Sequence, residues 1–140
     1  MNRTLVIVKP DAMERGLAGE ILGRLERKGL RLVAAELQRI TREVATRHYA
    51  EHAGKPFFED LVAFVTRSPA LVMVVEGPGD DTFAVVRTLM GATDPKQAAP
   101  GTIRGDLAVE LTEILVHGSD SEDSASRVIE IFFPGGDTRM

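Results

Sequence analysis

One histidine of this chain has the surroundings that a covalent nucleophile needs. His117 follows the apolar residues 114–116 and precedes Gly118, Ser119 and Asp120. A histidine at the end of an apolar strand, beside a polar turn, is well placed to face a cleft. Its ordinary pKa of about 6.5 leaves it largely neutral near neutral pH, and a neutral imidazole is a competent nucleophile when another group orients it. The same pattern also fits a histidine that only hydrogen-bonds its own turn, so this segment alone leaves both interpretations open.

Side chains that suit phosphate precede this histidine. Arg104 lies in the loop Gly101–Gly105, and Arg87 and Thr93 lie shortly before that loop. A guanidinium group holds phosphate oxygens in a planar fork, and a threonine hydroxyl adds a neutral donor. Lys9 directly follows an apolar run, where a lysine either reaches toward solvent or points into a site.

Charge and composition limit the ligands that these residues could serve. The formal net charge is −4, from 17 basic and 21 acidic side chains, so general nucleic-acid binding is not expected and any bound anion needs a local group of cations. Neither glycine-rich phosphate motif is complete, which leaves side chains to hold phosphate. The absence of cysteine excludes disulfides and a thiol nucleophile, and favours a cytoplasmic location. We expect no signal peptide and no membrane-spanning segment.

The hydrophobic pattern predicts the elements that would position these residues in one domain over residues 1–140. The predicted strands cover about 4–8, 30–40, 70–75 and 115–117, and the predicted helices cover about 19–28, 41–52, 56–65, 81–90 and the segment from Ser121 to Phe132. A long loop is expected at 91–106 because it is rich in glycine and proline. This order fits an α+β fold, a ferredoxin-like sandwich with a mainly antiparallel four-stranded sheet flanked by helices.

Several short motifs together resemble those of the nucleoside diphosphate kinase family. The resemblance covers nearly the whole chain in the family's order and spacing, and it rests on V-K-P-D at 8–11, R-G at 15–16, H-Y at 48–49, P-F-F at 56–58, G-T-I-R-G-D at 101–106 and H-G-S-D-S at 117–121. It implies an ATP- and nucleotide-binding transferase of nucleotide metabolism. Such a kinase moves the terminal phosphate of a nucleoside triphosphate to a nucleoside diphosphate by a ping-pong mechanism, through phosphorylated His117.

The resemblance also implies a role for individual residues. By this match Lys9, Arg87, Thr93 and Arg104 hold the phosphates, Lys9 and Tyr49 support catalysis at His117, and Phe57 stacks on the base with Val109 on its other side. Mg²⁺ would be carried mainly by the nucleotide phosphates, with Glu51 and Asp120 reaching it through water. Members of the family assemble as homo-oligomers, so a tetramer or a hexamer is expected.

Two positions depart from the family's pattern. Ile114 occupies the position where the family carries an asparagine that reaches the sugar hydroxyl, and isoleucine forms no side-chain hydrogen bond. Val128 occupies the position of a glutamate that hydrogen-bonds the catalytic imidazole. Glu130 is turned about 200° away on the same helix and cannot replace it. We therefore expect reduced activity. A smaller departure, Ala12 in place of glycine, should be tolerated.

Alternative interpretations remain at this point. A catalytically weakened kinase-fold protein that acts by nucleotide or partner binding would also explain Ile114 and Val128. His48 to His52 fit H-x-x-E-H, a zinc-peptidase pattern that requires two histidines on one helix face and a further ligand. Phe57 and Tyr49 could also be packing residues.

Overall fold

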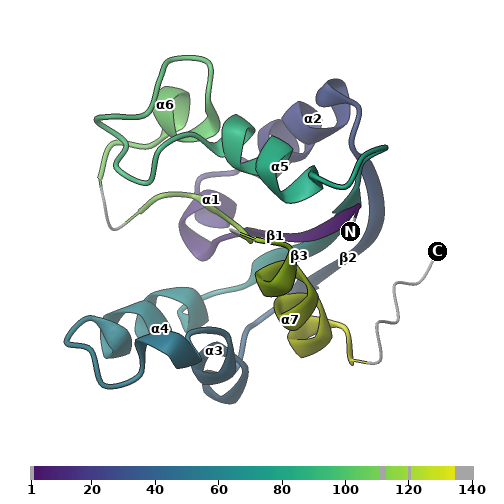
Figure 1. Cartoon of the computed structure of the whole chain (residues 1–140). Helices are drawn as coiled ribbons and strands as arrows, with labels where there is room; N and C mark the ends of the chain where they lie inside the picture. Colours follow the sequence, from purple (N-terminus) through teal and green to yellow (C-terminus); the bar gives the residue numbers. More distant parts are fainter. Residues whose placement is uncertain (1, 111–112, 120, 135–140) are drawn as a thin grey trace.

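The fold is a four-stranded antiparallel sheet covered by helices on both faces (Figure 1). The computed structural model describes residues 2–110, 113–119 and 121–134. The strand order is β2-β3-β1-β4, with bounds β1 Arg3–Val8, β2 Arg31–Gln38, β3 Ala70–Glu76 and β4 Val116–Gly118. The predicted ferredoxin-like α+β fold is confirmed.

The two central strands are apolar along their whole length because both of their faces are covered. In β1, Leu5 and Ile7 point into one core while Val6 and Val8 point into the other. All four side chains are fully buried, as is Val74 of the neighbouring strand β3. A strand that is buried on both faces shows no alternation of apolar and polar residues, which is why its sequence reads as a continuous apolar run.

The helices divide into two layers, one on each face of the sheet (Figure 1). One layer contains α1 Pro10–Glu14, α2 Ala18–Lys28, α5 Thr82–Met90 and α6 Ile103–Leu107. The other contains α3 Arg42–His48, α4 Phe58–Thr66 and α7 Glu122–Phe132. Within the part of the chain that the structure describes, no helix is long and apolar enough to cross a membrane.

Most of the predicted elements are confirmed at nearly the predicted bounds, and three differ. The short helix α1 was not predicted, because five residues starting at a proline give too little pattern to detect. The helix expected at 41–52 ends at His48 and is followed by the 3-10 helix η1 Ala50–His52. The loop expected at 91–106 contains the start of α6, where the Thr102 hydroxyl accepts a hydrogen bond from the Gly105 amide at 3.0 Å.

The last helix begins as its sequence predicts. The hydroxyl of Ser121 accepts a hydrogen bond from the Ser124 amide at 3.0 Å, which caps the first turn of α7. The inward stripe Ala125, Val128, Ile129 and Phe132 is buried, as predicted.

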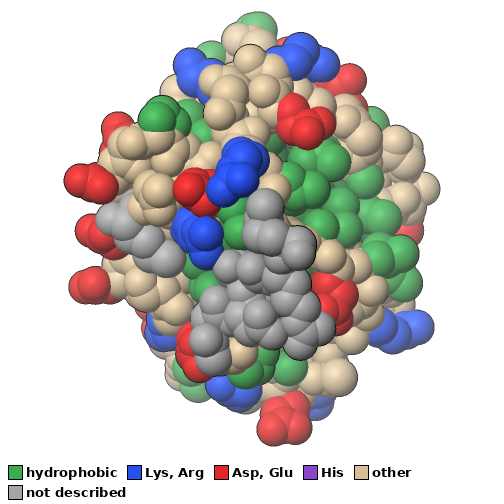
Figure 2. All heavy atoms as spheres, turned by 90° about the vertical axis from the view of Figure 1, so that its right-hand side faces the viewer, with side chains coloured by type: hydrophobic (Ala, Val, Ile, Leu, Met, Phe, Trp, Pro, Cys, Tyr) green, Lys and Arg blue, Asp and Glu red, His purple; other side chains and the backbone are tan. Residues whose placement is uncertain are grey.

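One edge of the sheet is open. Strand β2 pairs only with β3 in the described sheet, and its Leu37 side chain is 61% exposed. Figure 2, which views the molecule from the right-hand side of Figure 1, shows hydrophobic side chains exposed among charged ones on this side. Unpaired strand edges with apolar side chains are unusual on monomers, because they tend to pair with another chain.

Candidate active site

A cavity of about 310 Å³ opens at the end of β4, between the two helical layers. Its lining comes from the α3–α4 region, from α5 and the loop after it, and from α6, β4 and α7. The cavity gathers most of the residues that the sequence predicts for a site: His117, Tyr49, Glu51, Phe57, Arg87, Thr93, Arg104 and Ile114. Asp120 lies outside the described residues.

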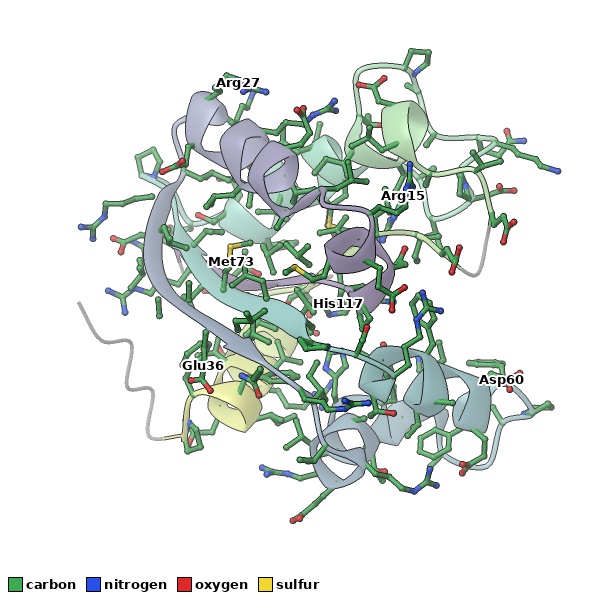
Figure 3. The ribbon with its side chains drawn as sticks, turned by 180° about the vertical axis from the view of Figure 1, so that it is seen from behind. Arg15, Arg27, Glu36, Asp60, Met73 and His117 are labelled. Carbon is green, nitrogen blue, oxygen red and sulfur yellow. The ribbon has the colours of Figure 1, made fainter. Side chains whose placement is uncertain are left out.

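His117 lies on β4, opposite Ile7 of β1, near the middle of the molecule (Figure 3). Its side chain is half-buried, and its Nε2 atom is buried without a hydrogen-bond partner among the described residues. Burial lowers the pKa of His117 well below its ordinary value of 6.5, and the nearby His48, Lys9 and Arg104 lower it further. The imidazole is therefore neutral at neutral pH, which is the form that acts as a nucleophile.

The backbone before His117 is held in an unusual conformation. Leu115 has a φ of +70°, and the amide of Val116 donates to the carbonyl of Ile114 at 2.7 Å, which makes a γ-turn of the rare positive-φ form. Asp11 Oδ2 accepts from the Leu115 amide at 3.0 Å, and the amide of Lys9 donates to the Leu115 carbonyl at 2.9 Å. This turn delays the start of β4 to Val116, one residue later than predicted. Strained backbone of this kind persists only where the surroundings hold it.

Arg104 is 4% exposed and binds the same turn from the other side. Its guanidinium donates to the carbonyls of Val116 at 2.8 Å, Gly91 at 3.1 Å and Ile114 at 3.3 Å. Burial, and secondarily the charge of Arg87, lowers the pKa of Arg104 to about 10, so it remains a cation. Arg104 thus fixes the backbone beside His117 and also carries positive charge to the cavity.

Lys9 is buried, with 6% of its surface exposed, and it is not part of the cavity lining. Its Nζ atom lies 5.5 Å from the centre of the Phe64 ring. Burial lowers the pKa of Lys9 to about 8, against the opposing influence of Asp11, and Arg104 lowers it further. Lys9 acts on the cavity through its charge, which lowers the pKa of His117.

The sequence of this chain is similar to those of known proteins along nearly its whole length. The sequence model of the nucleoside diphosphate kinase family matches residues 2–138. The chain belongs to the nucleoside diphosphate kinase family. It is 59% identical to the nucleoside diphosphate kinase of Thermomicrobium roseum, over 95% of this chain and 88% of that protein. It is 56% identical to the enzyme of Parafrankia sp., over 96% of each chain.

Solved kinase structures share the whole fold. A halophilic nucleoside diphosphate kinase from Halobacterium salinarum, in complex with CDP, superposes with a TM-score of 0.90 at 52% identity, covering 95% of this chain and 88% of that one. A nucleoside diphosphate kinase family protein from Babesia bovis gives a TM-score of 0.91 at 45% identity, with the same coverage.

The residues that this kinase would use around a phosphate differ in exposure. Arg87 on α5 and Thr93 in the following loop are exposed at the cavity. Arg87 Nη1 lies 3.5 Å from the carbonyl of Gly118, a long contact that leaves most of its donors available. These two side chains are therefore accessible to a ligand, whereas the donors of Arg104 are largely committed to backbone carbonyls.

The aromatic residues have different environments. Phe57 is 45% exposed at the cavity, which does not fit the alternative of a core residue. Tyr49 is buried in the core and also lines the cavity, and burial raises its pKa to about 12. Val109 is 75% exposed and does not line this cavity, so the structure does not bring it to Phe57.

Both departures from the kinase pattern lie at the cavity. Ile114 and Val128 line it, so each places an apolar side chain where the family's pattern has a polar one. Val128 is 1% exposed and belongs to the core cluster below the sheet. The hydroxyl of Ser119, directly after β4, is buried without a hydrogen-bond partner among the described residues.

The zinc pattern is not formed as its motif requires. His48 ends α3 and His52 lies in η1, so the two are not i, i+4 neighbours on one α-helix. Over the described residues, no three His, Cys, Asp or Glu side chains are grouped so as to hold a metal ion.

His48 itself was missed as a site residue, although the H-Y motif contains it. Its ring lies 4.6 Å from the His117 ring, centre to centre, at an interplanar angle of 84°. No sequence signal could have found this contact, because it joins α3 to β4 across 69 residues of chain.

Proposed function

We propose that this member of the nucleoside diphosphate kinase family transfers the terminal phosphate of a nucleoside triphosphate to a nucleoside diphosphate through phosphorylated His117. The family is one of enzymes that move phosphate between nucleotides. The single observation that carries the role of His117 is its neutral, half-buried imidazole at a cavity that also presents Arg87 and Arg104. The alternative of a protein that only binds nucleotide is not favoured, because these catalytic elements are present.

The geometry supports attack by the Nδ1 atom of His117. Nε2 is buried, so Nδ1 is the nitrogen left to meet a phosphate in the cavity. The Nδ1 lone pair forms a bond to the terminal phosphorus, and the bond from that phosphorus to the bridging oxygen breaks. The leaving diphosphate takes the electron pair of that bond. In the second half-reaction an oxygen of the acceptor diphosphate attacks the same phosphorus and the imidazole leaves, which restores neutral His117.

Positive charge around His117 stabilises this transfer. Phosphoryl transfer depends mainly on positioning and on neutralising the charge of the phosphate oxygens. Arg87 and Thr93 bind the phosphate directly, while Arg104 and Lys9 supply charge from buried positions. Phe57 stacks on the base from the exposed rim, where a π-face accepts any base.

A divalent metal, which we propose to be Mg²⁺, would be carried mainly by the nucleotide. Glu51 is the described carboxylate at the cavity, and Mg²⁺ typically uses one or two carboxylates together with phosphates and water. The residues therefore fit a metal that enters with the nucleotide, and Asp120 would be its second carboxylate. When bound, the ion neutralises phosphate charge.

We further propose that residues 1–140 act as one cytoplasmic kinase domain in a homo-oligomer, either a tetramer or a hexamer. The open edge of β2 and the exposed Leu37 support a contact with another copy. The CDP in the Halobacterium salinarum structure supports a nucleoside diphosphate as the ligand of this cavity.

The deciding experiment is phosphorylation without an acceptor. The protein is mixed with γ-labelled ATP and Mg²⁺, and acid-labile phosphate on the protein is measured for wild type and for His117→Ala. Label should appear only in wild type and should move to added GDP or UDP. Nucleotide binding without label would mean that Ile114 and Val128 have silenced the chemistry.

A further inference from the structure

His48 is a buried polar ring with an unexplained position. It is 5% exposed, and neither of its ring nitrogens has a hydrogen-bond partner among the described residues. Leaving a buried polar atom unpaired is costly, and such atoms are uncommon in native proteins. The ring is nevertheless firmly placed, because it contacts Tyr49 at 4.6 Å and Phe132 at 5.6 Å between ring centres. His48 therefore has hydrogen-bonding capacity that no described residue uses.

His117 lacks a described acceptor for the proton on its Nε2 atom. If Nδ1 attacks the phosphate, the single proton of the neutral imidazole must be on Nε2. That Nε2 atom is buried and also lacks a partner among the described residues. A histidine whose remote N–H is unheld can exchange between its two tautomers, and only one of them is nucleophilic at Nδ1.

The charged and apolar side chains around His117 cannot take this hydrogen bond, which among the described residues leaves His48 and the buried, unpaired hydroxyl of Ser119 as side-chain acceptors. Lys9, Arg87 and Arg104 are the cations that act on the ring, and ammonium and guanidinium groups only donate. Val128 has no polar atom. A neutral imidazole, in contrast, always has one nitrogen that accepts. His48 is in edge-to-face contact with His117, at 4.6 Å between ring centres, so it is the neighbouring ring that can offer that nitrogen to the Nε2 proton.

We propose that His48 is a positioning residue that accepts a hydrogen bond from Nε2 of His117 and so holds the nucleophile in its Nδ1-reactive tautomer. This role rests on the proposed function of His117, and the side chain of Val128 cannot fill it, since valine has no polar atom. The proton stays on Nε2 throughout, both before attack and in the phosphorylated ring, so His48 exchanges no proton and forms no bond to phosphorus.

Other features around His48 fit a neutral acceptor. Burial lowers the pKa of His48 to about 3, and the charges of Lys9, Arg127 and His52 lower it further. Arg127 on α7 donates to the backbone carbonyls of Arg47 at 3.2 Å and His48 at 3.3 Å, which ties the end of α3 beside the cavity. His48 thus stays uncharged and in place over the working pH range.

The test compares two substitutions of the same residue. His48→Phe keeps an aromatic ring but removes the acceptor, whereas His48→Gln keeps an acceptor. Ser119→Ala is the control, because it removes the buried, unpaired hydroxyl that directly follows β4. Nitrogen-15 shifts of the histidine rings report the His117 tautomer without nucleotide, and single-turnover mixing with ATP reports the phosphorylation rate.

We expect wild type and Ser119→Ala to carry the proton on Nε2 of His117. His48→Phe should show a mixture of tautomers, and its phosphorylation rate should fall roughly 10- to 100-fold with little change in the ATP concentration at half-saturation. His48→Gln should recover most of that rate.

Three results would overturn the proposal: wild type with the proton on Nδ1, His48→Phe with unchanged tautomer and rate, or equal losses in Phe and Gln variants. A wild-type spectrum with the proton on Nδ1 would overturn the proposal even if a variant does not fold. Because that spectrum needs no phosphorylation, it is also independent of whether His117 takes up label, and so separates failure of this role from failure of the proposed function.

Discussion

Replacing Lys9 with methionine should make the protein more stable while destroying its activity. Lys9 is 6% exposed, and burial lowers its pKa from 10.5 to about 8. Each pKa unit corresponds to about 1.36 kcal/mol, so keeping this ammonium charged in the folded protein costs about 3 kcal/mol. Methionine has a similar length and no charge, so Lys9→Met removes that cost.

Part of the gain is lost with the contact to Phe64. A lysine at 5.5 Å from a ring centre contributes roughly 1 kcal/mol of cation–π attraction. We therefore expect a net gain of about 2 kcal/mol in the free energy of unfolding. For a chain of this length the gain corresponds to a rise of roughly 8 °C in the thermal midpoint. Phosphorylation of His117 should fall roughly 100-fold or more, because a charge near the transferred phosphate is gone.

The stability difference between wild type and Lys9→Met should depend on pH in a defined direction. Since the pKa of Lys9 is lower in the folded protein than in the unfolded chain, the cost of its charge is fully present below about pH 8. It disappears as the pH rises toward 10.5, so wild-type stability should approach that of Lys9→Met over this window. Other groups that titrate there cancel in the difference between the two proteins.

The assay is urea unfolding at fixed protein concentration from pH 7 to pH 10.5, with Lys28→Met as the matched control. Lys28 is an exposed lysine at the end of α2, and its replacement should change stability by only a few tenths of a kcal/mol. If Lys9→Met is less stable than wild type at pH 7, the reasoning from burial is wrong. A gain that persists unchanged to pH 10.5 would refute the electrostatic origin.

Three further substitutions test other parts of the structure. Val128→Glu should raise the phosphorylation rate roughly 5- to 10-fold, because a charged acceptor holds the His117 ring about 1 kcal/mol more strongly than a neutral one. Val128→Gln should give no such gain in rate. Val128→Glu should also lower the free energy of unfolding, because position 128 is buried. Ile114→Asn should lower KM roughly 5-fold for nucleotides with sugar hydroxyls but not for 2′,3′-dideoxynucleotides, in steady-state assays. Gly105→Ala should severely destabilise the protein in thermal unfolding, because the new Cβ would collide with the backbone carbonyl of Ala99. Gly19→Ala, with open space around it on α2, should stabilise by about 1 kcal/mol.

The sheet could be predicted from the sequence because its central strands are continuous apolar runs. Leu5 to Val8 have no alternation, and the observed burial of both faces is the reason. The helix ends that were predicted correctly carry local signals, such as Gly29 in a left-handed conformation and Ser121 as a cap. In contrast, α1 is only five residues long, so its starting proline is not followed by enough pattern to detect, and the early end of α3 at His48 has no glycine or proline to mark it.

The site was predictable where a motif names the residue and unpredictable where two distant segments meet. Arg104 was expected as a phosphate ligand, yet the structure gives most of its donors to backbone carbonyls. Asp11 lies within the V-K-P-D motif, but its bond to Leu115 spans 104 residues. The positive φ of Leu115 could not be predicted either, because this backbone conformation is favoured by glycine and not by leucine.

The turn at Leu115 has a consequence for how broadly a nucleotide site can accept its substrates. The Lys9 amide, the Asp11 carboxylate and the Arg104 guanidinium all hydrogen-bond the backbone of this turn, so the end of the cavity at His117 is held in one conformation. The opposite end, at Phe57, is open to solvent, and we propose that its ring offers a flat contact to the base. Recognition of the group that all nucleotides share is thereby separated from contact with the part in which they differ. Under the roles proposed above, mutations near Phe57 should change base preference without moving the reacting atoms, so nucleobase selectivity and catalytic rate should vary independently.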